Sequence, residues 1–296
     1  MKNKKVLIIG SYGFIGTHLK NYLELKGFDV WGCDINVTEG VKYFRINTER
    51  PTFGSIFSNI FDICINCSGA ANVAASVEEP RKDFYLNTVN VFEILEAIHR
   101  ESPNCKFINL SSAAVYGNPK SLPVREIDNR GPVSPYGWHK LQAEDICTAF
   151  HDLFGIQTIS LRIFSAYGEG LKKQLLWDIF NKSRHSDYIE FWGTGNETRD
   201  FIYIRDLVHA IYLVINNAVF NGGYINVANG TEVSIKDVVN LVLKELDWKG
   251  EHKFIGQERA GDPSKWVADI TRLKDLGYEQ SVGFDSGVRK YCKWLM

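Results

Sequence analysis

A tyrosine and a lysine stand four positions apart in the segment 134–140, which reads Ser-Pro-Tyr-Gly-Trp-His-Lys. Ser134 and Pro135 are typical of the N-cap and the first position of a helix, so the segment predicts a helix. Tyr136 and Lys140 would then share one helical face. A phenol, whose pKa is about 10 in model peptides, is a poor base at neutral pH, but a neighbouring ammonium stabilises its phenolate. The pair is therefore suited to proton exchange with a bound hydroxyl.

Two serines that precede this pair could supply a third group. The apolar run 105–110 predicts a buried strand, and Ser111 and Ser112 follow it directly. A hydroxyl at the end of a strand that adjoins the helix could relay or orient a proton. These residues together predict a proton-transfer site.

Three glycines near the N-terminus lie between an apolar run and an amphipathic segment. Val6–Ile9 is predicted to be a strand, 17–26 is predicted to be a helix, and Gly10, Gly13 and Gly16 lie at or beside their junction. Glycines at such a junction let the backbone turn tightly and approach a pyrophosphate, which the helix amides and the positive dipole end can bind. The segment predicts a dinucleotide site.

The next predicted strand, 28–33, is followed by Asp34. A carboxylate at this position can accept hydrogen bonds from the ribose hydroxyls of adenosine, and it would repel a 2′-phosphate. Asp34 could instead form a simple turn before Asn36. With the glycines upstream, the ribose interpretation is favoured, and we expect NAD rather than NADP.

The first half of the chain alternates predicted strands with predicted helices, among them 81–100 and a helix from Tyr136 to Phe150. Strands joined by helical crossovers predict an α/β fold, a Rossmann-like doubly wound parallel sheet with right-handed connections. Its six strands are expected at 6–9, 28–33, 43–47, 61–66, 105–110 and 158–164.

The pattern is less regular after residue 164. We expect residues 1–165 to form the NAD-binding domain, to which 198–228 returns, and 166–296 to form a smaller C-terminal substrate-binding domain. In this part the sequence predicts helices at 172–183, 206–216 and 234–247, a last helix ending near Trp294, two short strands around a Gly-Asn loop within 188–204, and a strand at 224–227.

Composition excludes several classes of protein. The chain has 296 residues, 45% of them hydrophobic, and a formal net charge of -1, which gives no broad basic surface for nucleic acid or an anionic membrane. No apolar stretch approaches the roughly 20 residues of a membrane helix, and the basic start lacks a signal-peptide pattern. The six cysteines lie mostly in predicted strands and helices. We therefore expect reduced thiols, no metal site and a cytoplasmic protein that acts on a small molecule.

Several motifs occur together in one order along nearly the whole chain, and their combination carries a resemblance. The chain resembles the extended branch of the short-chain dehydrogenase/reductase superfamily. More narrowly, it is similar to the NAD-dependent nucleotide-sugar epimerase/dehydratase family, whose best-known type is UDP-glucose 4-epimerase. The motifs are Gly10-x-x-Gly13-x-x-Gly16, Asp34, the run from Ser111 to Gly117, Ser134 to Lys140, Thr198-Arg199-Asp200-Phe201-Ile202 and Arg259-x-Gly261-Asp262-Pro263.

The resemblance implies roles for individual residues. Ser112 aligns with the family's catalytic hydroxyl, Tyr136 is the group that takes the proton, and Lys140 stabilises its phenolate. Arg199 and Arg259 would approach the diphosphate of a nucleotide sugar, for which forked guanidinium donors are well suited. The implied cofactor-binding residues are Gly10, Gly13, Phe14, Ile15, Gly16, Asp34, Asn47, Ser68, Gly69, Ala70, Asn87, Tyr136 and Lys140, and the implied substrate-binding residues are Ser112, Ser165, Arg199 and Arg259.

Two of these positions depart from the family pattern. Ser165 stands where the family usually has a substrate-contacting asparagine, and Asn47 stands where an acidic residue usually contacts the adenine amino group. The identities of the nucleotide and the sugar therefore stay open. His139 neighbours Lys140 but would point elsewhere on the helix, and it is interpreted as structural.

The residues after Ser112 narrow the reaction. The family's 4,6-dehydratases carry an Asp-Glu pair there, because elimination of water needs an acid and a base besides the tyrosine. Ala113 and Ala114 cannot move a proton. The remaining set implies a nucleotide-sugar 4-epimerase, in which C4 is transiently oxidised to a 4-keto sugar and the hydride returns to the opposite face.

Two alternatives stay open. One is a nucleotide-sugar 4-ketoreductase or dehydrogenase with net cofactor turnover, and the other is a non-catalytic NAD-binding regulator, since a fold does not fix a function. Members of the family usually pair through two helices, here 81–100 and 136–150, so the resemblance also implies a homodimer.

Overall fold

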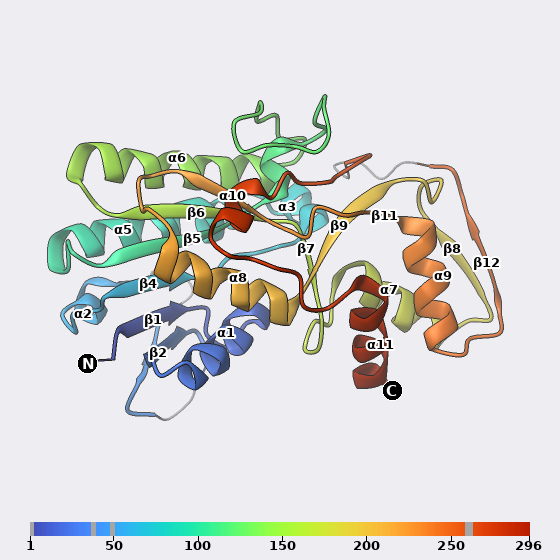
Figure 1. Ribbon diagram of the computed structural model, residues 1–296, viewed down its shortest axis with the longest axis horizontal. Coiled ribbons are helices and arrows are strands. Elements are labelled where there is room, and N and C mark those ends of the chain that lie inside the picture. The colour runs from blue at the N-terminus through green and yellow to red at the C-terminus, as the bar shows by residue number, and fades with distance from the viewer. Residues whose placement is uncertain (1–2, 37–39, 48–50, 258–262) are drawn as a thin grey trace.

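A parallel sheet of seven strands forms the centre of the computed structural model, which describes residues 3–36, 40–47, 51–257 and 263–296 (Figure 1). The strand order is β10-β6-β5-β4-β1-β2-β3, so the chain winds outward in both directions from β1. This is the doubly wound α/β fold that the sequence predicts, and the six predicted strands all form with ends within two residues. The strands are β1 Lys5–Ile9, β2 Asp29–Asp34, β3 Tyr43–Arg45, β4 Ile63–Asn66, β5 Lys106–Ser112, β6 Thr158–Ile163 and β10 Tyr224–Val227.

Helices cover both faces of this sheet, and the alternation of side chains along β1 shows which helices pack where. Val6 and Ile8 belong to one hydrophobic cluster, which also contains side chains of α1 (Phe14–Leu25) and α8 (Ile204–Asn217). Leu7 and Ile9 belong to a second cluster on the other face, because successive strand residues point to opposite sides. The helices of that second face are α2 Gly54–Phe57, α5 Asn90–Glu101 and α6 Pro135–Phe154.

The segment predicted as one helix over 81–100 is interrupted. It consists of α4 (Pro80–Phe84), a π-helical turn (Tyr85–Val89) and α5. A π-helical turn widens the hydrogen-bond pattern by one residue and is frequent at functional sites. This turn contains Asn87, one of the predicted cofactor-binding residues. The short helix α3 (Val73–Glu78) precedes α4.

The C-terminal part of the chain carries two small sheets beside the carboxyl ends of the large sheet (Figure 1). The predicted strands within 188–204 both form, as β8 (Tyr188–Phe191) and β9 (Thr198–Tyr203), but they belong to different sheets. Between them, the Glu197 carboxylate accepts hydrogen bonds from the amides of Thr194 and Gly195, each at 2.9 Å, and closes the loop. The two strands that flank this loop do not pair with each other: β8 pairs with β12, and β9 pairs with β11 and β7.

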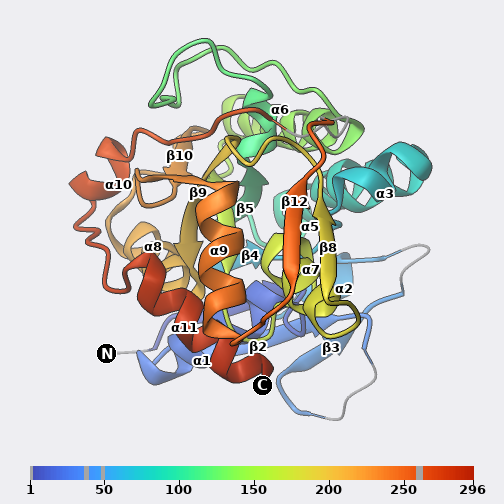
Figure 2. The same ribbon diagram turned by 90° about the vertical axis from the view of Figure 1, so that its right-hand side faces the viewer.

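Figure 2 looks directly at this part, where β12 lies beside β8 and α9 beside α11. The three-stranded sheet has the order β11-β9-β7, and the two-stranded sheet pairs β12 with β8. The sequence analysis missed β7, β11 and β12, each of only three or four residues. The bounds are β7 Ser165–Tyr167, α7 Gln174–Ser183, β11 Glu232–Ser234, α9 Ile235–Glu245, β12 Glu251–Phe254, α10 Thr271–Asp275 and α11 Phe284–Leu295.

All six cysteines are unpaired, and five of them are buried. Among the described residues, no helix is both long and apolar enough to span a membrane, and no group of three His, Cys, Asp or Glu side chains is arranged to hold a metal ion.

Candidate active site

Tyr136 and Lys140 lie in the first turns of α6, as their spacing predicts. The Ser134 hydroxyl caps the helix by accepting a hydrogen bond from the Gly137 amide at 3.2 Å, and Pro135 occupies the first helical position. Both functional side chains are buried, and Lys140 Nζ lies 5.9 Å from the centre of the Tyr136 ring. The helix start therefore brings the phenol and the ammonium together away from bulk water.

Burial dominates the electrostatics of this pair. It lowers the pKa of Lys140 to about 8, although the Asp83 carboxylate opposes that shift. It also raises the pKa of Tyr136 to about 12, while a hydrogen bond with the Ser112 side chain acts in the opposite direction. A cationic Lys140 costs desolvation energy here, so this site favours any ligand that brings a proton acceptor or further charge compensation to it.

The structure separates the roles of the two adjacent serines. The buried Ser111 hydroxyl donates to Glu144 Oε1 at 2.6 Å, on the side of β5 that packs against α6. The half-buried Ser112 hydroxyl instead accepts from the Ala114 amide at 3.2 Å. Of the two serines, it is Ser112 whose side chain forms the hydrogen bond that acts on the pKa of Tyr136.

A buried ion pair that the sequence analysis did not identify lies behind these serines. Arg162 on β6 and Glu144 on α6 are both fully buried, and they form two hydrogen bonds at 2.9 Å and 2.8 Å. The second guanidinium edge donates to the Tyr116 hydroxyl at 2.8 Å and to the Glu126 carbonyl at 2.9 Å. The available signal was an arginine inside a predicted strand of the central sheet, because a charge buried there needs a partner.

The glycine loop after β1 has the tight geometry of a phosphate cradle. Gly10 has φ +80°, and a Cβ at this position would lie 2.7 Å from the Ser68 amide nitrogen. A Cβ on Gly16 would lie 2.1 Å from the Gly10 carbonyl oxygen. Gly13 is the N-cap of α1 and has no side chain to bind the first-turn amides of Phe14 and Ile15. These amides and the helix dipole are suited to an anion.

Asp34 ends β2 directly beside this loop. Its carboxylate accepts from the Tyr12 amide at 2.9 Å and from the Ile35 amide at 2.7 Å. It also accepts from Asn36 Nδ2 at 3.3 Å, as the predicted turn role requires. A carboxylate has about four acceptor positions, so about one is left with which a ribose hydroxyl could pair. Asn47 is exposed beyond β3, one residue after Ile46, whose amide donates to the Asp34 carbonyl at 3.0 Å.

The segment after β4 lies against the glycine loop. The Ser68 hydroxyl donates to Asn66 Oδ1 at 2.6 Å, and Gly69 has φ +107°. Ala70 follows, half-buried. Asn87 lies beside Gly69, since a Cβ on that glycine would be 2.5 Å from Asn87 Oδ1. This buried oxygen has no hydrogen-bond partner among the described residues.

The predicted substrate residues that the structure describes, Ser112, Ser165 and Arg199, lie on strands that are linked by pairing or by direct chain connection. Ser112 pairs with Ile163 on β6, and Ser165 on β7 comes two residues later. Ser165 pairs with Phe201 on β9, two residues from Arg199. The Arg199 guanidinium lies 5.5 Å from the centre of the Trp266 ring. Arg259, together with Gly261 and Asp262 of its motif, lies outside the described residues.

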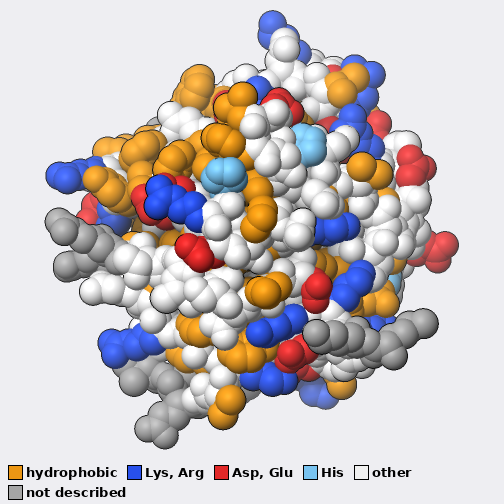
Figure 3. All heavy atoms as spheres, turned by 90° about the vertical axis from the view of Figure 1, so that its left-hand side faces the viewer, with side chains coloured by type: hydrophobic (Ala, Val, Ile, Leu, Met, Phe, Trp, Pro, Cys, Tyr) orange, Lys and Arg blue, Asp and Glu red, His pale blue; other side chains and the backbone are white. Residues whose placement is uncertain are grey.

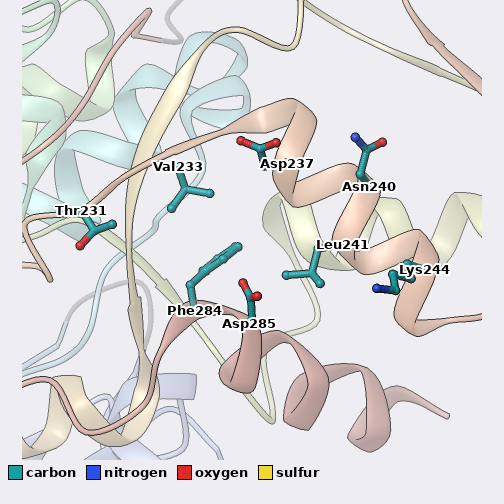
Figure 4. A pocket seen from close by; sticks show the side chains of 8 residues that line it. All are labelled: Thr231, Val233, Asp237, Asn240, Leu241, Lys244, Phe284 and Asp285. Atoms are coloured by element: carbon teal, nitrogen blue, oxygen red, sulfur yellow. The ribbon is translucent and has the colours of Figure 1, made fainter.

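A surface hollow of about 460 Å³ lies between α9 and α11 (Figure 4). Its walls include Leu241, Lys244 and Phe284. None of its lining residues belongs to the predicted site, and it is assigned no role in the chemistry.

The residues around the glycine loop fit NAD. The loop leaves no room for a Cβ on Gly10 or Gly16, no side chain caps the first amides of α1, and Asp34 stands at the end of β2. The unpartnered Asn87 oxygen adds a buried acceptor beside the same segment. All of these groups lie at the carboxyl ends of β1, β2 and β4, where doubly wound sheets bind dinucleotides.

A family model described as the NAD-dependent epimerase/dehydratase family matches residues 6–228. The chain belongs to this family. A curated relative, a putative UDP-glucose 4-epimerase from Methanocaldococcus jannaschii, is 27% identical over 98% of this chain and 98% of its own length. The family assignment agrees with NAD as the cofactor and with the motifs of the glycine loop and α6.

Two solved structures of similar proteins share the fold over nearly their full length. The UDP-N-acetylglucosamine 4-epimerase from Methanobrevibacter ruminantium, in complex with UDP-N-acetylmuramic acid, has a TM-score of 0.88 at 25% identity, and the match covers 100% of this chain and 99% of that one. The UDP-glucuronic acid 4-epimerase from Bacillus cereus, in complex with UDP-glucuronic acid and NAD, has a TM-score of 0.89 at 24% identity and 98% coverage of both chains.

Proposed function

We propose that this member of the epimerase/dehydratase family is an NAD-dependent nucleotide-sugar 4-epimerase. The observation that carries the proposal is the site formed by the buried Tyr136 and Lys140 and the half-buried Ser112, with two buried alanines after the serine and a loop that fits NAD beside it. The named relatives act on UDP-sugars, which supports a UDP-sugar as the substrate.

In this proposal each residue of the site handles a proton. Lys140, fixed by donating to the Leu110 carbonyl at 3.0 Å, supplies the positive charge that stabilises the phenolate of Tyr136. Tyr136 takes the proton of the sugar 4-hydroxyl and later returns it, and Ser112 orients that hydroxyl. When bound, NAD supplies the acceptor for the C4 hydride and the donor that returns it.

The two alanines after Ser112 exclude the elimination of water from the reactions of this site. Ala113 and Ala114 are both buried directly after Ser112, in the 3₁₀-helical turn Ala113–Tyr116. They offer neither an acid nor a base for eliminating water from the sugar. The site is therefore limited to the oxidation at C4 and its reversal, which is the chemistry of an epimerase.

The domain assignment follows from the same placement. We propose that residues 1–165 together with 198–228 bind NAD and that 166–296 contribute most of the nucleotide-sugar site. In support, β10 at 224–227 completes the large sheet, while β8, β11 and β12, which lie within 166–296 but outside 198–228, belong to the two small sheets. The guanidiniums of Arg199 and Arg259 would contact the diphosphate.

A homodimer and a cytoplasmic role in carbohydrate metabolism complete the proposal. On α4, the π-helical turn, α5 and α6, five aromatic side chains (Phe84, Tyr85, Phe92, Trp138 and Phe154) are 36% to 52% exposed. Figure 3 views the end of the molecule where α5 and α6 terminate, and hydrophobic side chains gather on part of it. Exposed apolar groups on these helices are suited to a second copy of the chain. Light scattering measures this association.

The proposed activity is tested by NMR of the purified protein with UDP-, GDP-, dTDP- and CDP-sugars and no added cofactor, while the NADH absorbance band is followed. Formation of a C4 epimer of a UDP-sugar without net NADH change is expected. Product that requires stoichiometric added cofactor would instead indicate a reductase or dehydrogenase. Inertness toward every sugar would favour a non-catalytic NAD-binding protein.

A further inference from the structure

Asp83 on α4 is a buried carboxylate, 4% exposed, for which the proposed reaction gives no direct role. Its Oδ1 accepts from Asn87 Nδ2 at 3.0 Å, and its Oδ2 lies 2.6 Å from His139 Nδ1. A carboxylate only accepts hydrogen bonds, so both partners must present an N–H to it. Asp83 therefore fixes the orientation of the Asn87 amide and the proton position on His139.

The orientation of Asn87 has a consequence at the predicted cofactor site. Because its amide nitrogen is directed at Asp83, its oxygen must face the other way, toward Gly69. Asn87 is 1% exposed, and this oxygen is the buried acceptor without a partner among the described residues. An unpartnered buried acceptor is costly unless a ligand or water donates to it. Asp83 therefore keeps the Asn87 side-chain oxygen, an acceptor without a partner among the described residues, directed toward Gly69.

His139 connects α6 with α4 through its side chain and with the π-helical turn through its backbone carbonyl. His139 immediately precedes Lys140, and its side chain is 13% exposed. Its backbone carbonyl also accepts from the Thr88 hydroxyl at 2.9 Å. The Asp83 contact joins α4, and the Thr88 hydrogen bond joins the turn that carries Asn87, to the helical residue next to Lys140.

Asp83 is also a negative charge close to both proton-handling groups. It raises the pKa of Lys140 and that of Tyr136. The other titratable groups that face Lys140 are Cys67 from the segment after β4 and Glu144 and Cys147 from α6, and Ser112 is the hydrogen-bonding neighbour of Tyr136. The residues beside Asp83 on its own helix, Arg81 and Lys82, are exposed.

We propose that Asp83 is a positioning residue for the reaction, because it holds the Asn87 acceptor toward Gly69 and, through His139, the α6 turn that carries Lys140. This inference rests on the proposed function, since it concerns the same site. In this proposal His139 has the structural role that the sequence analysis expects, as the link between Asp83 and α6. Asp83 itself touches neither substrate nor cofactor in this account.

The test compares Asp83→Asn, which keeps the shape and removes the charge, with Glu79→Gln as the matched control. Glu79 precedes α4 and forms an exposed ion pair with Lys82 at 2.9 Å. In Asp83→Asn we expect kcat to fall by roughly tenfold or more, because small displacements of reacting groups are costly, while KM changes by less than about twofold. Glu79→Gln should behave as the unaltered protein.

The pH profile of kcat distinguishes the proposed role of Asp83 from a merely structural one, because a merely structural residue would not shift the pH values of its two limbs. Loss of the negative charge lowers the pKa of both Tyr136 and Lys140, so both limbs of the profile should move to lower pH. An unchanged kcat, or a lower kcat with both limbs in place, would overturn the proposal.

A stability measurement keeps the inference separate from the proposed function. The Tm is measured for Asp83→Asn, for His139→Ala and for the double variant. If the two side chains interact, the sum of the Tm decreases of the single variants should exceed the Tm decrease of the double variant. If the unaltered protein epimerises no sugar, the proposed function fails while this cycle still tests the contact. Additive shifts would contradict the link between Asp83 and α6.

Discussion

Lys140 Nζ lies 3.0 Å from the carbonyl oxygen of Leu110, so the ammonium on α6 is fixed to β5 two residues before Ser112. The relative positions of Tyr136, Lys140 and Ser112 are thereby set by a helix and a strand that pack together, and not by a loop. Sites built on such elements hold their geometry better than sites on loops.

The two serines at the end of β5 offer a matched pair of variants. Ser112→Ala should lower kcat by about tenfold to a hundredfold, because it removes the hydroxyl beside Tyr136, and it should cost only about 0.5 to 1 kcal/mol of stability, because that hydroxyl also caps the Ala114 amide. Ser111→Ala should leave kcat nearly unchanged but lower the free energy of unfolding by about 1.5 to 3 kcal/mol, since buried Glu144 loses a donor at 2.6 Å. Steady-state kinetics and urea unfolding measure both, and the reverse pattern would show that the assignment is wrong.

The pKa of Lys140 predicts the alkaline side of the activity. Burial lowers that pKa to about 8, so the fraction of cationic Lys140 falls as pH rises through this value. Because the cation stabilises the phenolate, kcat/KM should fall above about pH 8. The measurement is kcat/KM from pH 6 to 10, roughly the range that brackets this group. A value that stays constant up to the alkaline end would exclude Lys140 as the titrating group.

The glycine loop can be tested without any substrate. In Gly16→Ala the new methyl group would lie 2.1 Å from the Gly10 carbonyl oxygen, so the loop must shift. We expect the purified variant to lose most of its bound NAD and about 1 to 3 kcal/mol of stability. The cofactor is quantified after denaturation. Gly54→Ala is the control, because a Cβ there meets nothing within 4 Å. Equal NAD content in both variants would contradict the prediction that the glycine loop binds NAD.

Much of the fold was predictable because its signals are local. The apolar strands and the Ser134-Pro135 helix start depend on neighbouring residues, and the structure places all of them as expected. The short strands β7, β11 and β12 were missed because three or four residues carry no periodicity, and their pairing is set by tertiary contacts.

The site could be predicted less completely. Gly10, Tyr136 and Lys140 stand out by type and spacing, whereas Ser112 was chosen over Ser111 by its alignment with the family motif, and which serine acts in the reaction stays a prediction. Asp83 and His139 are 56 positions apart, and only the packing of α4 against α6 brings them within 2.6 Å. A long-range polar contact of this kind leaves no pattern in a single sequence.

The most direct test of the central claim follows a deuterium label at C4 of the UDP-sugar that the protein accepts, in water without added cofactor. Transient oxidation at C4 with return of the same hydride predicts a C4 epimer that retains its deuterium, with Tyr136→Phe inactive as the control. A product that has exchanged the label for solvent hydrogen, or one that forms only when NADH or NAD is consumed, would contradict the account.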